Sequence, residues 1–344
     1  METKRYQPTE ENIRMAGQVI RQGGLVAFPT ETVYGLGADG LSPEAVGKIY
    51  EAKGRPSDNP MILHISSPLD LEKLTYEITP VTEALIQIFW PGPLTLVVKK
   101  RDMVPDEVTG GLNTVAVRMP NHEVALALIE EAGCPIAAPS ANLSGKPSPT
   151  RAEDVWEDLS GKIDVLLDGE PCMVGIESTV VDVTVPGKVT VLRPGFITVK
   201  SIQEVLKAFG LDEVQVHWGE ETGPEEAPRS PGMKYRHYAP QAEMIVLEGP
   251  GEAVLAEMAR IREEKEREPR GDGQTKKVGI LFFQEVDPKE VAHDFFSRLR
   301  DLDRQGVDSI LAAALESDDG VAYAVMNRML KSAGYKVMKV GAKK

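Results

Sequence analysis

The sequence predicts an α/β protein of two domains, and three observations support this. At 344 residues the chain is long enough for about two domains. Helical and extended patterns alternate along the first two thirds. A Pro-, Gly- and Glu-rich stretch, residues 217–232, separates this part from a further α/β segment and has the composition of a linker.

The first domain begins with a helix whose apolar residues Ile13, Ala16 and Ile20 have helical spacing and which ends at Gly23. A second helix is expected between Ser42, an N-cap residue, and Gly54. Short apolar runs predict the strands "LVAFP", "MILHIS", "LTLVVKK", "TVAVRMP", "PIAAPS", "STVVDVT" and "KVTVLRP". The last two runs are separated by "VPGK", which predicts that they form a hairpin. Such an order predicts mixed strand directions rather than a run of parallel units.

Beyond the linker, strand and helix patterns alternate at a spacing of about 30 residues. This regularity predicts a small three-layer domain with a parallel sheet. The linker itself ends in "MKYRHYAP", a basic and aromatic cluster that a plain tether does not require. We therefore place the boundaries at 1–212 for the first domain, 213–240 for the linker and 241–344 for the second domain.

The composition excludes several classes of protein. A net charge of −14 argues against charge-driven binding to nucleic acid or anionic membranes as the main function. No apolar run approaches the length of a membrane span, and the N-terminus has no signal-peptide core. Two isolated cysteines and five histidines give no zinc spacing. We expect a cytoplasmic protein with no membrane segment.

Several familiar motifs are weak or absent. The glycines of "GLGADG" match a dinucleotide-binding pattern, but they neither follow a strand directly nor open a helix, so glycines in a loop are the favoured interpretation. No P-loop and no GxSxG nucleophile elbow occurs.

Cations instead gather in stiff loops. "KGRPSDNP" places Lys53 and Arg55 after a helix end, and two prolines reduce the freedom of the loop, which favours anion binding. "PTETVYGLG" crowds hydroxyls and a carboxylate at the end of a strand. "APSANLSGKPSPT" adds short polar side chains, and Arg118 and Arg193 lie at strand positions where a charge needs a partner. Cations, hydroxyls and stiff loops without a nucleophile are typical of phosphoryl or nucleotidyl transfer.

These motifs, in order, resemble the YrdC-type threonylcarbamoyl-AMP synthases: "PTETVYGLG", "KGRPSDNP", "WPGPLTLV", "VRMP", "PSANLSG", "ESTVVD" and "LRPG". The resemblance covers roughly residues 10–210. The linker, "SPGMKYRHYAP" and the C-terminal segment resemble the long, two-domain form. The resemblance implies a twisted mixed sheet around a basic concave cavity, followed by a Rossmann-like domain.

The implied enzyme is a nucleotidyltransferase. It would convert L-threonine, bicarbonate or CO2 and ATP, with Mg, into threonylcarbamoyl-AMP and pyrophosphate. The product would pass to the machinery that transfers threonylcarbamoyl to tRNA next to the anticodon. Tight binding of tRNA by this chain is not expected.

The resemblance also implies site residues. Lys53 and Arg55 would be catalytic and would bind the phosphates. Contacts to ATP are expected from Lys53, Arg55, Asn59, Thr114, Ser140, Asn142, Ser148, Arg193, Tyr235 and Arg236. Contacts to L-threonine are expected from Thr32, His64, Arg118, Ala138 and Ser178. The segment 213–240 would act as a lid over the site, and the metal ligands are not assigned.

Two alternatives stay open at this point. One is an RNA-binding module that uses a basic cavity without catalysis. The other is a dinucleotide-dependent oxidoreductase that uses "GLGADG".

Overall fold

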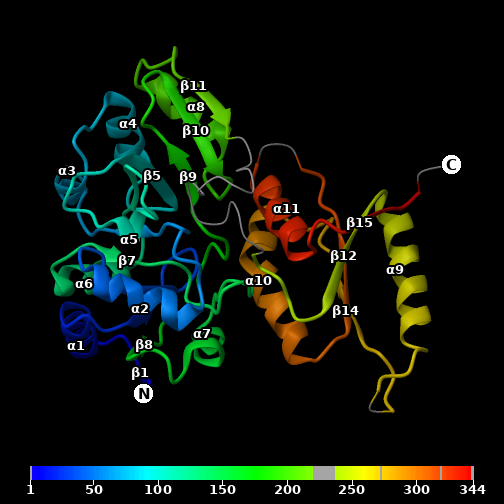
Figure 1. Ribbon diagram of the computed structural model, residues 1–344. Coiled ribbons are helices and arrows are strands. Elements are labelled where there is room, and N and C mark those ends of the chain that lie inside the picture. Colours follow the sequence, from blue (N-terminus) through cyan, green and yellow to red (C-terminus); the bar gives the residue numbers. More distant parts are fainter. Residues whose placement is uncertain (1, 220–236, 272, 318–319, 342–344) are drawn as a thin grey trace. The chain divides into compact units, whose positions relative to one another are not determined.

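The computed structural model describes residues 2–219, 237–271, 273–317 and 320–341. The chain divides into two compact units (Figure 1). Unit 1 comprises Met1–Ser144 and Ser148–Tyr235, and unit 2 comprises Gly145–Pro147 and Arg236–Lys344. In the described residues, no helix combines the length and the apolar character that crossing a membrane would require. Cys134 and Cys172 are both free thiols.

Unit 1 is built on a mixed sheet of eleven described strands in the order β1-β8-β2-β3-β7-β4-β6-β5-β9-β10-β11. The strands are β1 (Lys4–Tyr6), β2 (Val26–Phe28), β3 (Gly35–Asp39), β4 (Ile62–His64), β5 (Leu94–Lys99), β6 (Thr114–Arg118), β7 (Ile136–Ala137), β8 (Val165–Leu167), β9 (Thr179–Asp182), β10 (Lys188–Arg193) and β11 (Gln215–Trp218). The sheet contains parallel pairs such as β4–β6 and antiparallel pairs such as β5–β6, so its strand directions are mixed, as the sequence predicts.

The helices of unit 1 are α1 (Glu10–Arg21), α2 (Pro43–Lys53), α3 (Leu71–Leu74), α4 (Pro80–Phe89), α5 (Asp106–Thr109), α6 (Glu123–Ala132), α7 (Ala152–Leu159) and α8 (Val199–Ala208), with a 3-10 turn at Pro68–Asp70. The expected N-cap of α2 is confirmed, because the Ser42 side chain accepts a hydrogen bond from the amide of Ala45. Gly54 ends this helix with a φ of 62°, a conformation that favours glycine. Lys53 is therefore the last residue of a firmly bounded helix.

The hairpin expected from "VPGK" is confirmed by the antiparallel pairing of β9 with β10. The loop interpretation of "GLGADG" is wrong, because Gly35–Asp39 forms β3 between the antiparallel neighbours β2 and β7. Glycine is required here by close packing. A Cβ atom on Gly37 would lie 2.7 Å from Ile136 Cγ2 and 2.8 Å from Phe28 Cε1. These glycines therefore open no helix, which the dinucleotide-binding pattern requires.

The last strand of unit 1 lies in the range 213–240 that the sequence predicts as linker. Gln215–Trp218, β11, pairs with β10 in parallel and extends the sheet. Only Val216 of this strand is partly buried and the other three residues are exposed, so the strand has no apolar pattern that would set it apart from the linker.

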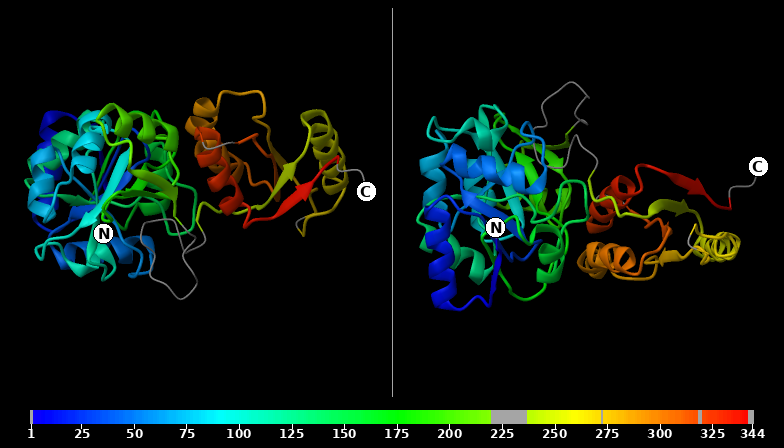
Figure 2. Two further views of the ribbon diagram at one scale, coloured as in Figure 1. Left: turned by 90° about the horizontal axis from the view of Figure 1, so that it is seen from above. Right: turned by 60° about the horizontal axis from the view of Figure 1, so that its bottom comes forward.

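Unit 2 is a three-layer α/β unit, as expected. Its strands are β12 (Glu243–Glu248), β13 (Val278–Leu281), β14 (Ser309–Ala313) and β15 (Val337–Lys339), and its helices are α9 (Gly251–Lys265), α10 (Pro288–Arg304) and α11 (Val321–Ser332). The described strands run in the order β13-β14-β12-β15 and every pair is parallel. Figures 1 and 2 show α9 on one face of this sheet and α10 and α11 on the other.

The close packing at β3 gives the first prediction. Gly37→Ala should lower the free energy of unfolding of unit 1 by about 1–3 kcal/mol, because the added methyl group overpacks the core. Gly47→Ala is the matched control: a Cβ there meets nothing within 4 Å in the middle of α2, so stability should rise by about 0.5–1 kcal/mol. Urea unfolding followed by tryptophan fluorescence measures both, since Trp90, Trp156 and Trp218 all belong to unit 1. A Gly37→Ala protein as stable as wild type would contradict the packing argument.

Candidate active site

Three polar segments of unit 1 lie side by side through backbone hydrogen bonds. The Ala141 amide donates to Tyr34 O at 2.8 Å, and the Tyr34 amide donates to Pro149 O at 2.9 Å. The amide of Gly175 donates to Thr32 O at 3.1 Å. The segments around residues 30–34, 138–144 with 148–150, and 174–178, which are far apart in sequence, therefore form one frame for functional side chains.

Lys53 joins this frame to the end of α2. Its Nζ donates to Ser140 O at 2.5 Å and to Asn142 O at 2.6 Å, and it lies 3.5 Å from Asn142 Oδ1. The side chain is buried, since Lys53 is only 3% exposed. The structure thus brings together three residues that the sequence places in one site, Lys53, Ser140 and Asn142. It also gives Lys53 backbone partners that the sequence does not reveal.

Ser140 and Asn142 are ordered by each other. Ser140 Oγ donates to Asn142 Oδ1 at 2.5 Å, and Asn142 Nδ2 donates to Leu143 O at 2.8 Å. Ser140 also bridges to Gly35 at the start of β3. The loop that follows β7 is therefore held in place from both sides.

The loop of "KGRPSDNP" is closed by its own arginine. Arg55 Nη2 donates to Pro60 O at 2.9 Å, and Nε donates to Asn59 O at 3.3 Å. Tyr50, on α2, donates its hydroxyl to the same Asn59 carbonyl at 3.2 Å. Asn59 is 2% exposed, and its side-chain Oδ1 has no hydrogen-bond partner in the described structure. A buried amide oxygen without a partner suits contact with a ligand.

Three residues predicted to contact L-threonine come together from separate elements. His64 on β4 lies opposite Arg118 on β6 in the parallel register. Arg118 Nη1 donates to Thr32 Oγ1 at 2.9 Å, and Nε donates to Gly92 O at 3.1 Å. Burial and the charge of Arg118 lower the pKa of His64 to about 3, so its imidazole is uncharged at neutral pH.

Arg118 has a further partner that the sequence analysis did not assign. Its Nη2 lies 2.6 Å from Glu31 Oε2, and both side chains are at least nine-tenths buried. Glu31 is visible in "PTETVYGLG" as one carboxylate among hydroxyls. The position of Arg118 within a strand is the signal that could have identified Glu31, because a buried guanidinium requires an anion or a ligand.

Ser178 and Arg193 also meet. Arg193 Nε donates to Ser178 O at 3.0 Å, and Nη2 donates to Ser178 Oγ at 3.2 Å. The hydroxyl of Thr95 lies 2.7 Å from Ser178 Oγ, a contact absent from the sequence predictions. Ser148 Oγ donates to Glu177 Oε1 at 2.5 Å. Ala138 is buried and its amide donates to Ile62 O at 3.0 Å, which places it beside β4.

Other predicted residues are not brought into this group. Thr114 begins β6, at the opposite end of the strand from Arg118. Tyr235 and Arg236 lie outside the described residues. Across the part of the chain that the structure describes, no group of three or more His, Cys, Asp or Glu side chains is placed to hold a metal ion.

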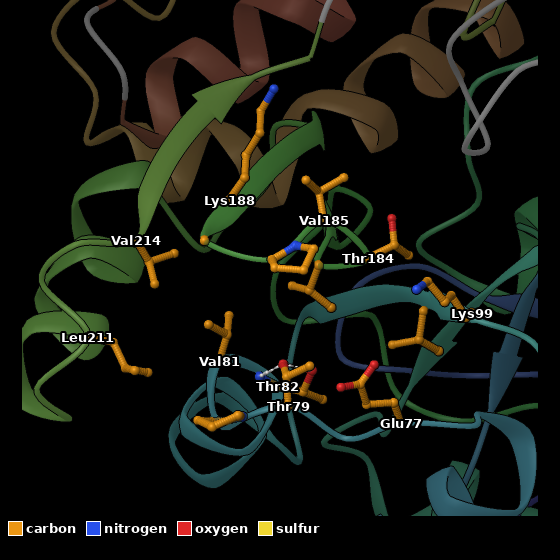
Figure 3. Close-up of a pocket in the computed structure, with 15 residues that line it drawn as sticks. Glu77, Thr79, Val81, Thr82, Lys99, Thr184, Val185, Lys188, Leu211 and Val214 are labelled. Carbon is orange, nitrogen blue, oxygen red and sulfur yellow. Dashed lines mark hydrogen bonds between the residues drawn. The ribbon is translucent and has the colours of Figure 1, made fainter.

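A separate pocket of about 330 Å³ opens elsewhere on unit 1 (Figure 3). Val81, Leu211 and Val214 contribute apolar side chains from α4 and from the segment between α8 and β11. Lys99 and Glu77 contribute charged groups. None of the predicted site residues lines this pocket.

The neutral state of His64 predicts a pH dependence. Between pH 6.5 and about 3 the unfolded chain binds a proton at His64 that the folded chain does not, so stability falls as pH falls. Between pH 7 and pH 5, wild type should therefore lose about 2 kcal/mol more free energy of unfolding than His64→Gln. Urea unfolding followed by tryptophan fluorescence at the two pH values measures this, with His217→Gln, at an exposed histidine of unit 1, as control. Equal losses in wild type and His64→Gln would contradict the assignment.

Comparisons with known proteins identify relatives of both units of the chain. A family model described as "Telomere recombination" matches residues 18–195, and one described as "Threonylcarbamoyl-AMP synthase, C-terminal domain" matches residues 197–334. The chain is 48% identical to the threonylcarbamoyl-AMP synthase of Pyrococcus abyssi, over 96% of each chain. It is 43% identical to the Bacillus subtilis protein of that name, over 98% of this chain and 100% of that one.

A comparison with solved structures identifies the same family. Sua5 from P. abyssi in complex with L-threonine superposes with a TM-score of 0.86 at 46% identity, and the match covers 98% of this chain and 99% of that one. Both units of the present chain are included in that match. The chain therefore belongs to the threonylcarbamoyl-AMP synthase family, in its long form with two domains.

Proposed function

We propose that this protein makes threonylcarbamoyl-AMP and pyrophosphate from L-threonine, bicarbonate or CO2, and ATP. The observation that carries the proposal is the convergence of Thr32, His64 and Arg118 from three segments of unit 1. A hydroxyl, an uncharged imidazole and a guanidinium suit a small polar amino acid with a carboxylate. The P. abyssi relative, whose solved structure contains L-threonine, is consistent with this choice of substrate.

The reaction is a nucleotidyl transfer. The uncharged amine of threonine first attacks the carbon of CO2, and its nitrogen loses a proton to solvent, which gives a carbamate. A carbamate oxygen then attacks the α-phosphorus of ATP, the bond from that phosphorus to the bridging oxygen breaks, and pyrophosphate leaves. Positioning and charge stabilisation carry such a step, and no covalent intermediate with the enzyme is required.

On the nucleotide side, the cations have distinct roles. Arg55 is the candidate for the phosphates. Lys53, with its contacts to Ser140 O and Asn142 O, orders the loop whose side chains would meet ATP. Asn59 offers its buried side-chain oxygen, and Arg193 adds a guanidinium beside Ser178. Contacts from Thr114, Ser148, Tyr235 and Arg236 stay predictions.

Mg²⁺ would enter with ATP, since this ion binds largely through substrate phosphates and water. Among the described residues, no cluster of carboxylates or histidines is placed to hold it. The side chains of the site would contribute by orienting the substrates and by placing positive charge beside the phosphates.

The product would serve the enzymes that transfer threonylcarbamoyl to tRNA, in the cytoplasm. The RNA-binding alternative has no described feature in its favour, and the relatives from P. abyssi and B. subtilis carry the name of an enzyme.

Pyrophosphate release from ATP tests the reaction. We expect release to require both L-threonine and bicarbonate, because the carbamate is the nucleophile. Omitting either one should reduce the rate to background. Release that is independent of threonine would point to a different adenylating or hydrolysing activity and would contradict the proposal.

Arg55→Ala tests the phosphate role. The value of kcat/KM for ATP should fall about 10²-fold or more, because a charge that stabilises the leaving pyrophosphate is lost. Arg101→Ala is the matched control, since Arg101 likewise donates to a backbone carbonyl, that of Thr75, but lies outside the predicted site. Unfolding curves of both variants show whether the fold is retained. Full activity of a folded Arg55→Ala enzyme would exclude the role.

A further inference from the structure

Glu31 and Arg118 form a buried ion pair at the amino-acid side of the site. The exposed fractions of their side chains are 8% and 4%, and Glu31 Oε2 lies 2.6 Å from Arg118 Nη2. Two buried charges are stable only when each has its partner, because desolvation otherwise penalises both. The pair is net neutral.

The carboxylate of Glu31 accepts no hydrogen bond in the described structure. Its Oε1 is buried and has no hydrogen-bond partner in the described structure. Its Oε2 makes the close ionic contact, but the N–H bond of Arg118 is not aligned with it well enough to count as a hydrogen bond. A carboxylate has about four acceptor positions, so this group retains capacity for a donor such as an ammonium.

Arg118 has capacity as well. Its Nε donates to Gly92 O and its Nη1 to Thr32 Oγ1, and Nη2 contacts Glu31. The two hydrogen bonds use two of the five N–H bonds of the guanidinium, and Nη2 makes only the ionic contact. The rest can receive a carboxylate.

The surroundings of Glu31 supply no second cation among the described residues. His122, which precedes α6, has a pKa lowered by burial despite the opposing charge of Glu31, and its Nδ1 is buried without a hydrogen-bond partner. His64 is uncharged at neutral pH, since burial and Arg118 lower its pKa to about 3. The thiol of Cys172 is also buried, and its pKa is raised. Within the described part of the chain, the ion pair of Glu31 is with Arg118.

The backbone holds Glu31 in place. The amide of Val174 donates to Glu31 O at 2.7 Å. Thr30 Oγ1 accepts from the amides of Thr32 and Val33 at 3.1 Å and 3.2 Å. The turn that carries Glu31 is therefore ordered without any hydrogen bond from its carboxylate, which leaves the carboxylate available for another task.

We propose that Glu31 receives the α-ammonium group of the amino-acid substrate, while Arg118 receives its carboxylate. This assignment rests on the proposed function and adds a specificity-determining residue to it. An amino acid is a zwitterion, so its two charges match a carboxylate and a guanidinium that already lie in contact. Binding exchanges one neutral pair for two, and no net charge is buried. The site then selects a free α-amine and rejects a 2-hydroxy acid.

The test compares two ligands on two proteins by calorimetry. The ligands are L-threonine and 2,3-dihydroxybutanoate of the same configuration, in which a hydroxyl replaces the amine. Wild type should bind threonine more tightly. In Glu31→Gln the affinity for threonine should fall about tenfold or more, because a charged hydrogen bond is lost. The affinity for the dihydroxy acid should not fall, because its carboxylate then pairs with Arg118 without a competing carboxylate.

Other outcomes overturn the assignment. An equal loss for both ligands in Glu31→Gln would mean that Glu31 acts only by supporting Arg118. A retained preference for threonine, or a wild type without that preference, would also overturn it. Asp182→Asn is the matched control, because it removes another buried carboxylate, which accepts from Thr184, and should leave the ratio unchanged.

A second variant covers the case in which Glu31→Gln does not fold. Glu31→Asp keeps the charge, so it should keep a preference for threonine, and loss of that preference would contradict the proposal. Pyrophosphate release by wild type is measured in parallel. Threonine binding with the expected preference but without pyrophosphate release would defeat the proposed function and leave the Glu31 assignment standing. Pyrophosphate release without a preference for threonine over the dihydroxy acid would support the proposed function and overturn the Glu31 assignment.

Discussion

The ammonium group of Lys53 is the contact on which the rest of the site depends. Lys53 is the last residue of α2, and its ammonium group donates to the carbonyls of Ser140 and Asn142. A buried lysine is tolerable only when its donors are satisfied, and here backbone carbonyls satisfy them. The helix end thereby fixes the loop after β7, and that loop in turn holds the turn around Tyr34 through the Ala141 amide. Lys53 thus supports the site as structure, whatever contact it makes with phosphate.

The remaining charges follow the same logic. Arg55, Arg118 and Arg193 each donate to nearby backbone carbonyls, which fixes the direction of the guanidinium before any ligand arrives. Such preorganisation reduces the ordering required on binding. Glu31 differs because its carboxylate has an ionic contact but no hydrogen bond. The carboxylate of Glu31 can therefore accept a hydrogen bond from the ammonium group of a substrate.

The fold was predictable where local rules act alone. Ser42 and Gly54 bound α2 because capping and a left-handed residue are local chemistry, and the hairpin of β9 and β10 follows from its turn. The interpretation of "GLGADG" failed because Phe28 and Ile136, which exclude a side chain at Gly37, come from other parts of the chain. For the site, the motifs identified Lys53, Ser140 and Asn142 as a group, yet they could not indicate that backbone carbonyls are the partners of Lys53.

By itself the sequence determined the family resemblance, the two α/β units and the polar motifs, since these depend on residue order and local pattern. Only the tertiary structure decided which motif side chains meet. Glu31 and Arg118 are far apart along the chain, and their contact exists because β6 ends beside the turn that follows β2. Thr95 and Ser178 likewise meet because β5 and β9 run parallel. Such pairings are set by sheet register and by burial, which penalises an unpaired charge wherever its partner lies in the sequence.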